Sequence, residues 1–300
     1  MIYNDRQHFF KYTTAETAKL IIGSRKLRWS SPLLFNDPFD HQTGFAFPFT
    51  GKEFSEAFLE ASLQVVYGNV PFNPMHQTKY GEMLRIARAK RDRLSRDRFE
   101  ADLQVAVVEM AGNFPGLSQE LNEKLTTQLA RSRVLCLTER NDNLVMWSHY
   151  ANSHRGVVFK FRRLEHIDHR FLAAEPVQYS SEPISFLGLQ DYVDHVFGIK
   201  RHDFLSRVWD MAFRKHADWS YEQEWRVHVA LRAGEDPGPG YSDDEEPPEL
   251  FEAIYLGCRM GQESAAEFVQ LIQEKLPEAK IFKAQKQVVG IGLDFLPVDA

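Results

Sequence analysis

Residues 219–227 read Trp219-Ser220-Tyr221-Glu222-Gln223-Glu224-Trp225-Arg226-Val227, and they are the most informative segment of this 300-residue chain. A β-rich run, Trp225 to Leu231, follows the two glutamates directly. In a strand, side chains two residues apart point to the same face. We therefore expect Glu222 and Glu224 to project together from the start of a strand.

Two carboxylates on one face repel each other, so this pair suggests a function. Such a pair can position a substrate hydroxyl, stabilise a developing cation or hold a metal ion. The alternative is a solvated strand edge on which Glu224 pairs with Arg226, because charged side chains are usually exposed. Spacing alone leaves both interpretations open.

Composition describes an ordinary globular protein, with 43% hydrophobic and 26% charged residues and a net charge of -6. That charge gives the whole chain no case for binding nucleic acid. Cys136 and Cys258 stand in apolar, strand-like segments, and they predict buried, reduced thiols. The first residues lack the apolar core of a signal peptide, and no segment approaches the ~18 apolar residues of a membrane span. We expect a cytoplasmic protein without a membrane segment.

Strand signals cluster at the start and in the second half of the chain, and residues 52–131 between them read as helical. Segregated strands and helices are typical of α+β proteins. We predict a single α+β domain over residues 1–300, with a mixed, mostly antiparallel sheet and a helical insertion at 52–131. Residues 234–248 are rich in Gly, Pro, Asp and Glu, which predicts a flexible, exposed acidic loop.

Residues 79–98 carry eight Lys or Arg within this insertion. Their loose apolar stripe predicts one long amphipathic helix with a solvated basic face. The functional alternative is a docking face for RNA, DNA or an acidic partner.

Two further clusters combine polar and aromatic residues, namely 36–41 (Asn-Asp-Pro-Phe-Asp-His) and 146–150 (Met-Trp-Ser-His-Tyr). Each has a structural explanation, because Asx side chains stabilise turns and aromatic residues on a short helix are commonly core. Three such clusters, distant in sequence, each depart from plain core or plain surface. We therefore expect both clusters to share one cleft with Glu224.

The motifs FNDPFD, DNLVMWSHYANSHRGVVF and WSYEQEWRV occur in an order, and with flanks, that resemble the bacterial family called domain of unknown function 2971. This resemblance covers the chain apart from the helical middle and the acidic loop. The family name implies no activity.

A more distant resemblance does imply one. The segment Phe10-Lys11-Tyr12-Thr13-Thr14, followed by a helix, Gly23 and a strand, is similar to the opening of ADP-ribosyltransferases. Those enzymes hold NAD with a His or Arg on the first strand, and they carry a catalytic Glu at the start of a late strand. Lys11 stands where the His or Arg is expected, and Lys cannot make the forked hydrogen bonds of Arg.

The resemblance implies that NAD is a substrate and loses nicotinamide through a cation-like ribose. Glu224 would bind the ribose 2′-hydroxyl and stabilise that cation, and Glu222 would orient or deprotonate an acceptor, which is a protein or a nucleic acid. Small transferases of this type often serve as toxins or defence effectors. The nucleotide-binding residues implied are Lys11, Tyr12, Asn36, Asp37, Trp147, His149, Tyr150 and Arg226, with Trp147 or Tyr150 stacking on a base and Arg226 either binding pyrophosphate or pairing with Glu224.

Two other functions compete with this one. A metal-dependent hydrolase or nuclease would use hard oxygen ligands and one imidazole, supplied by Asp37, Asp40, Glu222, Glu224 and His149. A sensor module would bind a nucleotide or peptide in the same cluster without turnover.

Overall fold

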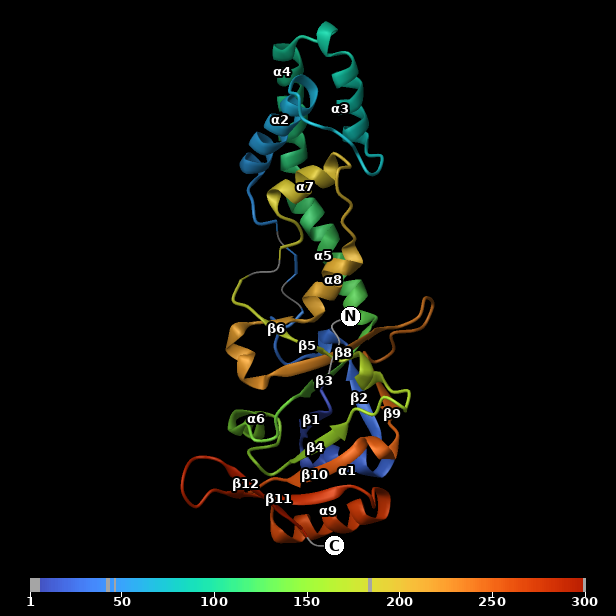
Figure 1. Cartoon of the computed structure of the whole chain (residues 1–300), viewed down its shortest axis with the longest axis vertical. Coiled ribbons are helices and arrows are strands. Elements are labelled where there is room, and N and C mark those ends of the chain that lie inside the picture. Colours follow the sequence, from blue (N-terminus) through green and yellow to red (C-terminus); the bar gives the residue numbers. More distant parts are fainter. Residues whose placement is uncertain (1–5, 42–43, 46, 183–184, 299–300) are drawn as a thin grey trace. The chain divides into compact units, whose positions relative to one another are not determined.

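The computed structural model of the chain describes residues 6–41, 44–45, 47–182 and 185–298. The chain forms two compact units, labelled by element in Figure 1. The sheet unit consists of Met1–Gln42, Gln128–Ser181 and Phe213–Ala300, and the helical unit consists of Thr43–Thr127 and Glu182–Ala212. The fold is α+β with a mixed, mostly antiparallel sheet, so the predicted class is confirmed.

Strands of the described residues form a ten-stranded sheet in the sheet unit. Its pairs are antiparallel except for the parallel pair β10–β11, and β6 and β7 form a separate parallel pair. The strand bounds are β1 His8–Thr13, β2 Lys26–Ser30, β3 Ser132–Thr138, β4 Val157–Arg162, β5 Glu175–Pro176, β6 Gln178–Tyr179, β7 Arg214–Lys215, β8 Glu224–Ala230, β9 Tyr241–Glu245, β10 Phe251–Leu256, β11 Lys280–Lys286 and β12 Leu293–Pro297.

Strand β3 is the branching point of this sheet. Along one edge it pairs with β8 over its whole length, from Ser132 to Thr138. Along the other edge it pairs with β1 at Thr138 and with β2 at Val134. Between these two positions the Cys136 carbonyl accepts a hydrogen bond from the Lys11 ammonium at 3.1 Å. The sheet therefore opens between β1 and β2, and polar side chains can enter there.

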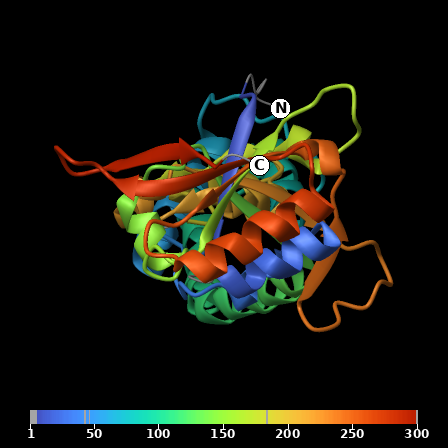
Figure 2. The same ribbon diagram turned by 90° about the horizontal axis from the view of Figure 1, so that it is seen from below.

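Helices α1 (Ala15–Ser24) and α9 (Gln262–Lys275) lie side by side in Figure 2. Their apolar side chains, including Ile22 and Phe268, pack with sheet residues such as Trp29 and Phe159 into one fully buried cluster. Burial of each large apolar side chain stabilises the fold by roughly 1.5–3 kcal/mol. This cluster fixes the sheet from which the candidate site is built.

The helical unit has its own apolar core, centred on Phe54, Phe58, Leu84 and Phe197. The predicted helical segment 52–131 is interrupted three times. Residues 68–78 contain no helix, the predicted helix 79–98 ends at Ala89, and Asn113 separates two further helices. A short 3₁₀ turn, η2 (Arg91–Arg93), follows, and a new helix begins at Arg96 after Ser95, a residue type favoured at helix starts. The helices of this region are α2 Gly51–Tyr67, α3 Lys79–Ala89, α4 Arg96–Gly112, α5 Phe114–Ala130, α7 Leu189–Val196 and α8 Phe204–Ala212. Among the described residues, no helix is both long enough and apolar enough to cross a membrane.

The acidic segment 234–248 is not a continuous loop, because residues 241–245 form β9 and pair with β2. Oppositely charged side chains accompany this pairing. The Arg28 guanidinium donates to both carboxylate oxygens of Asp243, at 2.9 and 3.1 Å, and Arg25 pairs with Glu245. Cross-strand pairs of opposite charge stabilise a sheet edge. A segment whose composition predicts a flexible loop therefore contains an edge strand of the sheet.

Glu246, directly after β9, is buried in the sheet unit, and burial raises its pKa to about 7. Protonated Glu246 therefore contributes to the stability of the fold. This contribution is fully present below pH 4.5, the pKa of the glutamate in the unfolded chain, and it is lost as the pH rises through about 7. We predict that Glu246→Gln is more stable than the native chain by about 1–3 kcal/mol at pH 8.5 and nearly equal to it at pH 4.5. Urea unfolding at the two pH values measures this difference. The exposed control Glu249→Gln should show no such pH-dependent gain, and an equal gain in both variants would contradict the assignment.

Candidate functional site

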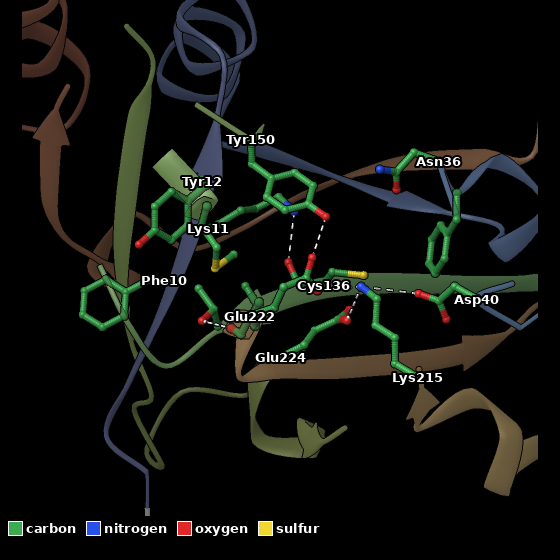
Figure 3. Close-up of a pocket in the computed structure, with 14 residues that line it drawn as sticks. Phe10, Lys11, Tyr12, Asn36, Asp40, Cys136, Tyr150, Lys215, Glu222 and Glu224 are labelled. Carbon is green, nitrogen blue, oxygen red and sulfur yellow. Dashed lines mark hydrogen bonds and ion pairs between the residues drawn. The ribbon is translucent and has the colours of Figure 1, made fainter. Parts of the chain in front are cut away.

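A cavity of about 180 Å³ opens in the sheet unit where β1 and β2 separate (Figure 3). Its wall combines side chains from β1, β3, the loop after η1 (Pro32–Leu34), α6 (Leu144–His149) with the residue after it, and the segment 215–224. The lining residues are Phe10, Lys11, Tyr12, Phe35, Asn36, Asp40, Cys136, Leu137, Thr138, Met146, Tyr150, Lys215, Glu222 and Glu224. Three sequence clusters thus contribute to one site.

Glu222 and Glu224 both reach this cavity, but not through the expected strand geometry. Glu222 ends a 3₁₀ helix, η4 (Ala217–Glu222), and Glu224 is the first residue of β8. Gln223 between them has a left-handed backbone, with φ 45°. The predicted alternation along one strand is therefore wrong for Glu222, and a turn brings the two carboxylates together instead.

Lys215 is the residue that joins the two carboxylates. Its ammonium donates to Glu222 Oε2 at 2.5 Å and to Glu224 Oε2 at 3.1 Å, and it lies 3.6 Å from Asp40 Oδ2. The same ammonium lies 4.9 Å from the centre of the Trp219 ring, within cation–π range. The side chain is only 7% exposed. Sequence reasoning missed Lys215, and the one available signal is indirect, since a buried carboxylate pair requires a nearby cation.

Arg226 lies behind the cavity wall and is fully buried. Its guanidinium donates to both oxygens of Glu224, at 2.8 and 3.0 Å, and to Asp40 Oδ2 at 2.5 Å. It also contacts the imidazole of His41, whose pKa is held well below its ordinary value by burial and by Arg226. Neutral His41 can accept a hydrogen bond from the guanidinium. Arg226 thus pairs with Glu224 and does not line the cavity, so no pyrophosphate can reach it in this arrangement.

The pKa values of the two glutamates are shifted in opposite directions. Burial opposes ionisation of both, but in Glu224 the attraction of Arg226 and Lys215 prevails, so its pKa is lowered. In Glu222 burial and the neighbouring Glu224 carboxylate prevail, so its pKa is raised. Glu224 therefore stays ionised to lower pH than an ordinary glutamate, whereas Glu222 takes up a proton at higher pH than an ordinary glutamate.

Backbone groups hold this pair in place. The Thr138 hydroxyl donates to the Glu222 carbonyl at 2.6 Å, and the Glu224 N–H donates to the Tyr179 hydroxyl at 2.8 Å. Neither Thr138 nor Tyr179 was found from the sequence, because each acts from another strand and belongs to no local motif.

Four of the predicted binding residues line the cavity, namely Lys11, Tyr12, Asn36 and Tyr150. The Tyr150 hydroxyl donates to Glu222 Oε1 at 2.5 Å, and this aromatic side chain is half-buried. Lys11 donates to the Cys136 carbonyl, and burial lowers its pKa. Two of its three N–H donors form no hydrogen bond within the described residues.

Three other predicted residues do not line the cavity. Asp37 accepts a hydrogen bond from the Phe39 N–H at 2.9 Å, which is an Asx turn. Trp147 is fully buried against Tyr12, and its indole N–H donates to the Asn141 carbonyl at 2.7 Å. His149 is exposed and contacts the Tyr221 hydroxyl at 3.3 Å. Trp147 therefore cannot stack on a ligand, because no face of its indole is accessible.

A left-handed turn follows α6. Asn152, Ser153 and His154 have φ values of 44°, 53° and 66°. Such values are uncommon for residues other than Gly, with Asn and His among the types that tolerate them best. The His154 ring stacks on Trp147 at 6.0 Å and 8°. The turn thereby closes over the buried indole and fixes the helix that presents Tyr150.

Metal binding gains no support from this arrangement. Over residues 6–41, 44–45, 47–182 and 185–298, no group of three or more His, Cys, Asp or Glu is placed to hold a metal ion. The carboxylates of Asp40, Glu222 and Glu224 instead converge on the cations of Lys215 and Arg226. The metal ligands expected for a hydrolase are also not all in one place, because Asp37 and His149 do not line the cavity.

Arg226 should be essential for stability. Arg226→Met leaves the buried carboxylates of Glu224 and Asp40 without their main counter-charge, and breaking a buried pair in this way costs about 3–5 kcal/mol. The matched control is Arg28→Met, which removes an exposed Arg paired with Asp243 and should cost about 1 kcal/mol or less. Urea unfolding of both variants measures the difference, and similar losses in the two would show that the buried network has no special weight.

The family model described as "Protein of unknown function (DUF2971)" matches residues 146–227. This stretch begins at Met146, just before Trp147, and ends at Val227, so it spans Tyr150, Lys215 and the two glutamates of the cavity. No curated protein matches the chain, and no solved structure matches it. The resemblance to the domain of unknown function 2971 is therefore supported over residues 146–227.

Proposed function

We propose that the chain is an ADP-ribosyltransferase-like enzyme that cleaves the nicotinamide–ribose bond of NAD in the cavity of Figure 3. The observation that carries the proposal is the meeting, in one cavity, of a basic residue from the first strand and a carboxylate at the start of a late strand. Lys11 of β1 and Glu224 of β8 occupy these positions. The resemblance to ADP-ribosyltransferases implies this combination.

The size of the cavity suits one end of the dinucleotide. Pockets for whole drug-sized ligands typically measure about 300–1,000 Å³. A volume of about 180 Å³ fits a single ring with part of a sugar. We therefore assign the enclosed part to nicotinamide and its ribose, with the remainder of NAD outside it.

The opposite pKa shifts of the glutamates divide the labour between them. Carboxylates whose environments separate their pKa values commonly serve different steps of one reaction. Glu224, held ionised, would accept a hydrogen bond from the ribose 2′-hydroxyl and stabilise positive charge as nicotinamide departs. Glu222, whose pKa is raised, would take the proton from the acceptor that attacks the ribose.

Charged side chains surround the site of a developing cation. Asp40, Glu222 and Glu224 contribute three negative charges when ionised, and Lys11, Lys215 and Arg226 contribute three positive charges. Because these charges balance, stabilisation of a cation-like ribose would rest on the Glu224 carboxylate at the cavity and not on an excess of negative charge. Lys215 meanwhile keeps two like charges together that would otherwise separate.

The remaining polar groups can orient the ligand. Lys11 has two unused N–H donors for a carboxamide or phosphate oxygen, and Asn36 lines the cavity with an amide. The ring of Tyr150 can pack against nicotinamide while its hydroxyl holds Glu222. The acceptor itself, a protein or a nucleic acid, is not specified by these contacts.

Release of nicotinamide from NAD tests the proposal directly. Glu224→Gln is nearly isosteric and removes only the negative charge, so we predict a loss of about 10²–10³ in kcat, similar to removal of one preorganised stabilising group. Glu222→Gln should reduce transfer to an acceptor more than it reduces release of nicotinamide. Chromatography of nicotinamide and of labelled ADP-ribose products measures both steps.

Circular dichroism should confirm that each variant is folded, and Glu263→Gln on the exposed surface of α9 is the matched control with unchanged turnover. Normal turnover in folded Glu224→Gln would remove the catalytic role. Calorimetric titration with NAD separates the remaining case, because saturable binding without release of nicotinamide would identify a sensor module. Addition of divalent metal should leave release unchanged, and a strict requirement for metal would favour the hydrolase instead.

A further inference from the structure

The connection between α3 and α4 in the helical unit (Figure 1) carries a concentrated positive charge. Residues 88–98, here called the basic turn, contain five Arg and one Lys against two Asp, which gives a local charge of 6 − 2 = +4 in a chain of net charge -6. Lys90, Arg91, Arg93, Arg96 and Arg98 are all exposed.

These cations lack the partners that Arg residues have elsewhere. In the sheet unit Arg25, Arg28 and Arg140 each pair with a nearby acid. In the basic turn Arg91 approaches Asp92 at 3.8 Å, and the other four exposed cations form no ion pair with any described residue. A solvated face that merely confers solubility usually mixes both signs of charge. Here the guanidinium groups remain available to a ligand.

The basic turn is also held in a defined conformation. Leu94 packs against the core of the helical unit, and its carbonyl accepts a hydrogen bond from the Tyr67 hydroxyl at 3.1 Å. On the α3 side the Arg88 guanidinium donates to the Val70 carbonyl at 2.7 Å. The cations next to these anchors are therefore displayed on a fixed scaffold, which lowers the entropic cost of binding.

We propose that the basic turn binds the phosphate backbone of a nucleic-acid duplex. Arg predominates over Lys, and its planar fork is suited to bidentate contact with phosphate. Helix α4 begins within the turn, and its N-cap Ser95 makes no side-chain capping bond. The backbone N–H groups at this helix N-terminus therefore add to the positive potential of the turn. Between residues 79 and 98 the only aromatic residue is Tyr80, which is half-buried. Without exposed rings for base stacking, the surface fits a duplex rather than a single strand.

Fluorescence anisotropy with a labelled 20-base-pair DNA duplex and the full chain tests this proposal. Binding should weaken steeply between about 50 and 300 mM NaCl, since each neutralised phosphate releases counterions with a slope near −0.9. The fourfold variant Arg91→Gln, Arg93→Gln, Arg96→Gln, Arg98→Gln should bind at least about tenfold more weakly at 100 mM NaCl, with a salt slope smaller by about 3 to 4.

The matched control removes four exposed cations elsewhere, through Lys52→Gln, Lys124→Gln, Lys275→Gln and Lys280→Gln. It has the same net charge as the fourfold variant and should retain most of the affinity. Equal losses in both variants would reduce the effect to net charge and overturn the proposal, as would absence of duplex binding by the native chain. Tighter binding of a 20-nucleotide single strand would overturn the choice of duplex, and equal competition by polyglutamate would point to an acidic protein instead. Circular dichroism verifies the fold of both variants.

Discussion

The candidate site in the sheet unit depends on the ion pairs of the buried Arg226 guanidinium. Removing such a charge from water costs free energy. This cost is offset only when carboxylates pair with the charge and accept its hydrogen bonds. Glu224 provides two hydrogen bonds from the same strand, and Asp40 provides one from the loop after η1. One cation thus joins the start of β8 to a segment more than 180 positions earlier. The shape of the cavity wall follows from that link.

Lys215 provides a second positive charge next to these carboxylates. Because it lies between Glu222 and Glu224, it allows two like charges to remain close together without separating. The two groups still experience different surroundings, since Arg226 reaches Glu224 and Tyr150 reaches Glu222. An asymmetric environment around a close pair is how one pocket provides both a permanent negative charge and a proton acceptor.

Local patterns in the sequence were sufficient for the fold class and for singling out Glu222 and Glu224, which lie at one cavity. They failed where the decisive partner was distant. The strand alternation that grouped the glutamates does not exist, because Gln223 turns the chain, and Lys215 is what unites them. The predicted ligand contact of Trp147 is also wrong, because aromatic character alone cannot distinguish a buried indole from a ligand contact. Burial and pairing across strands depend on tertiary contacts that no short window contains.

The left-handed turn at residues 152–154 has a consequence for how related sequences are interpreted. Backbone in this region costs roughly 1–3 kcal/mol for each residue other than Gly, and surrounding contacts must supply that energy. The residue types allowed there are limited by geometry, independently of any chemistry in the cavity. If relatives preserve Asn152 or His154 next to their own Trp-Ser-His-Tyr segment, the preservation would reflect a strained backbone that keeps α6 in place. A search for catalytic groups among conserved positions should therefore give those residues little weight.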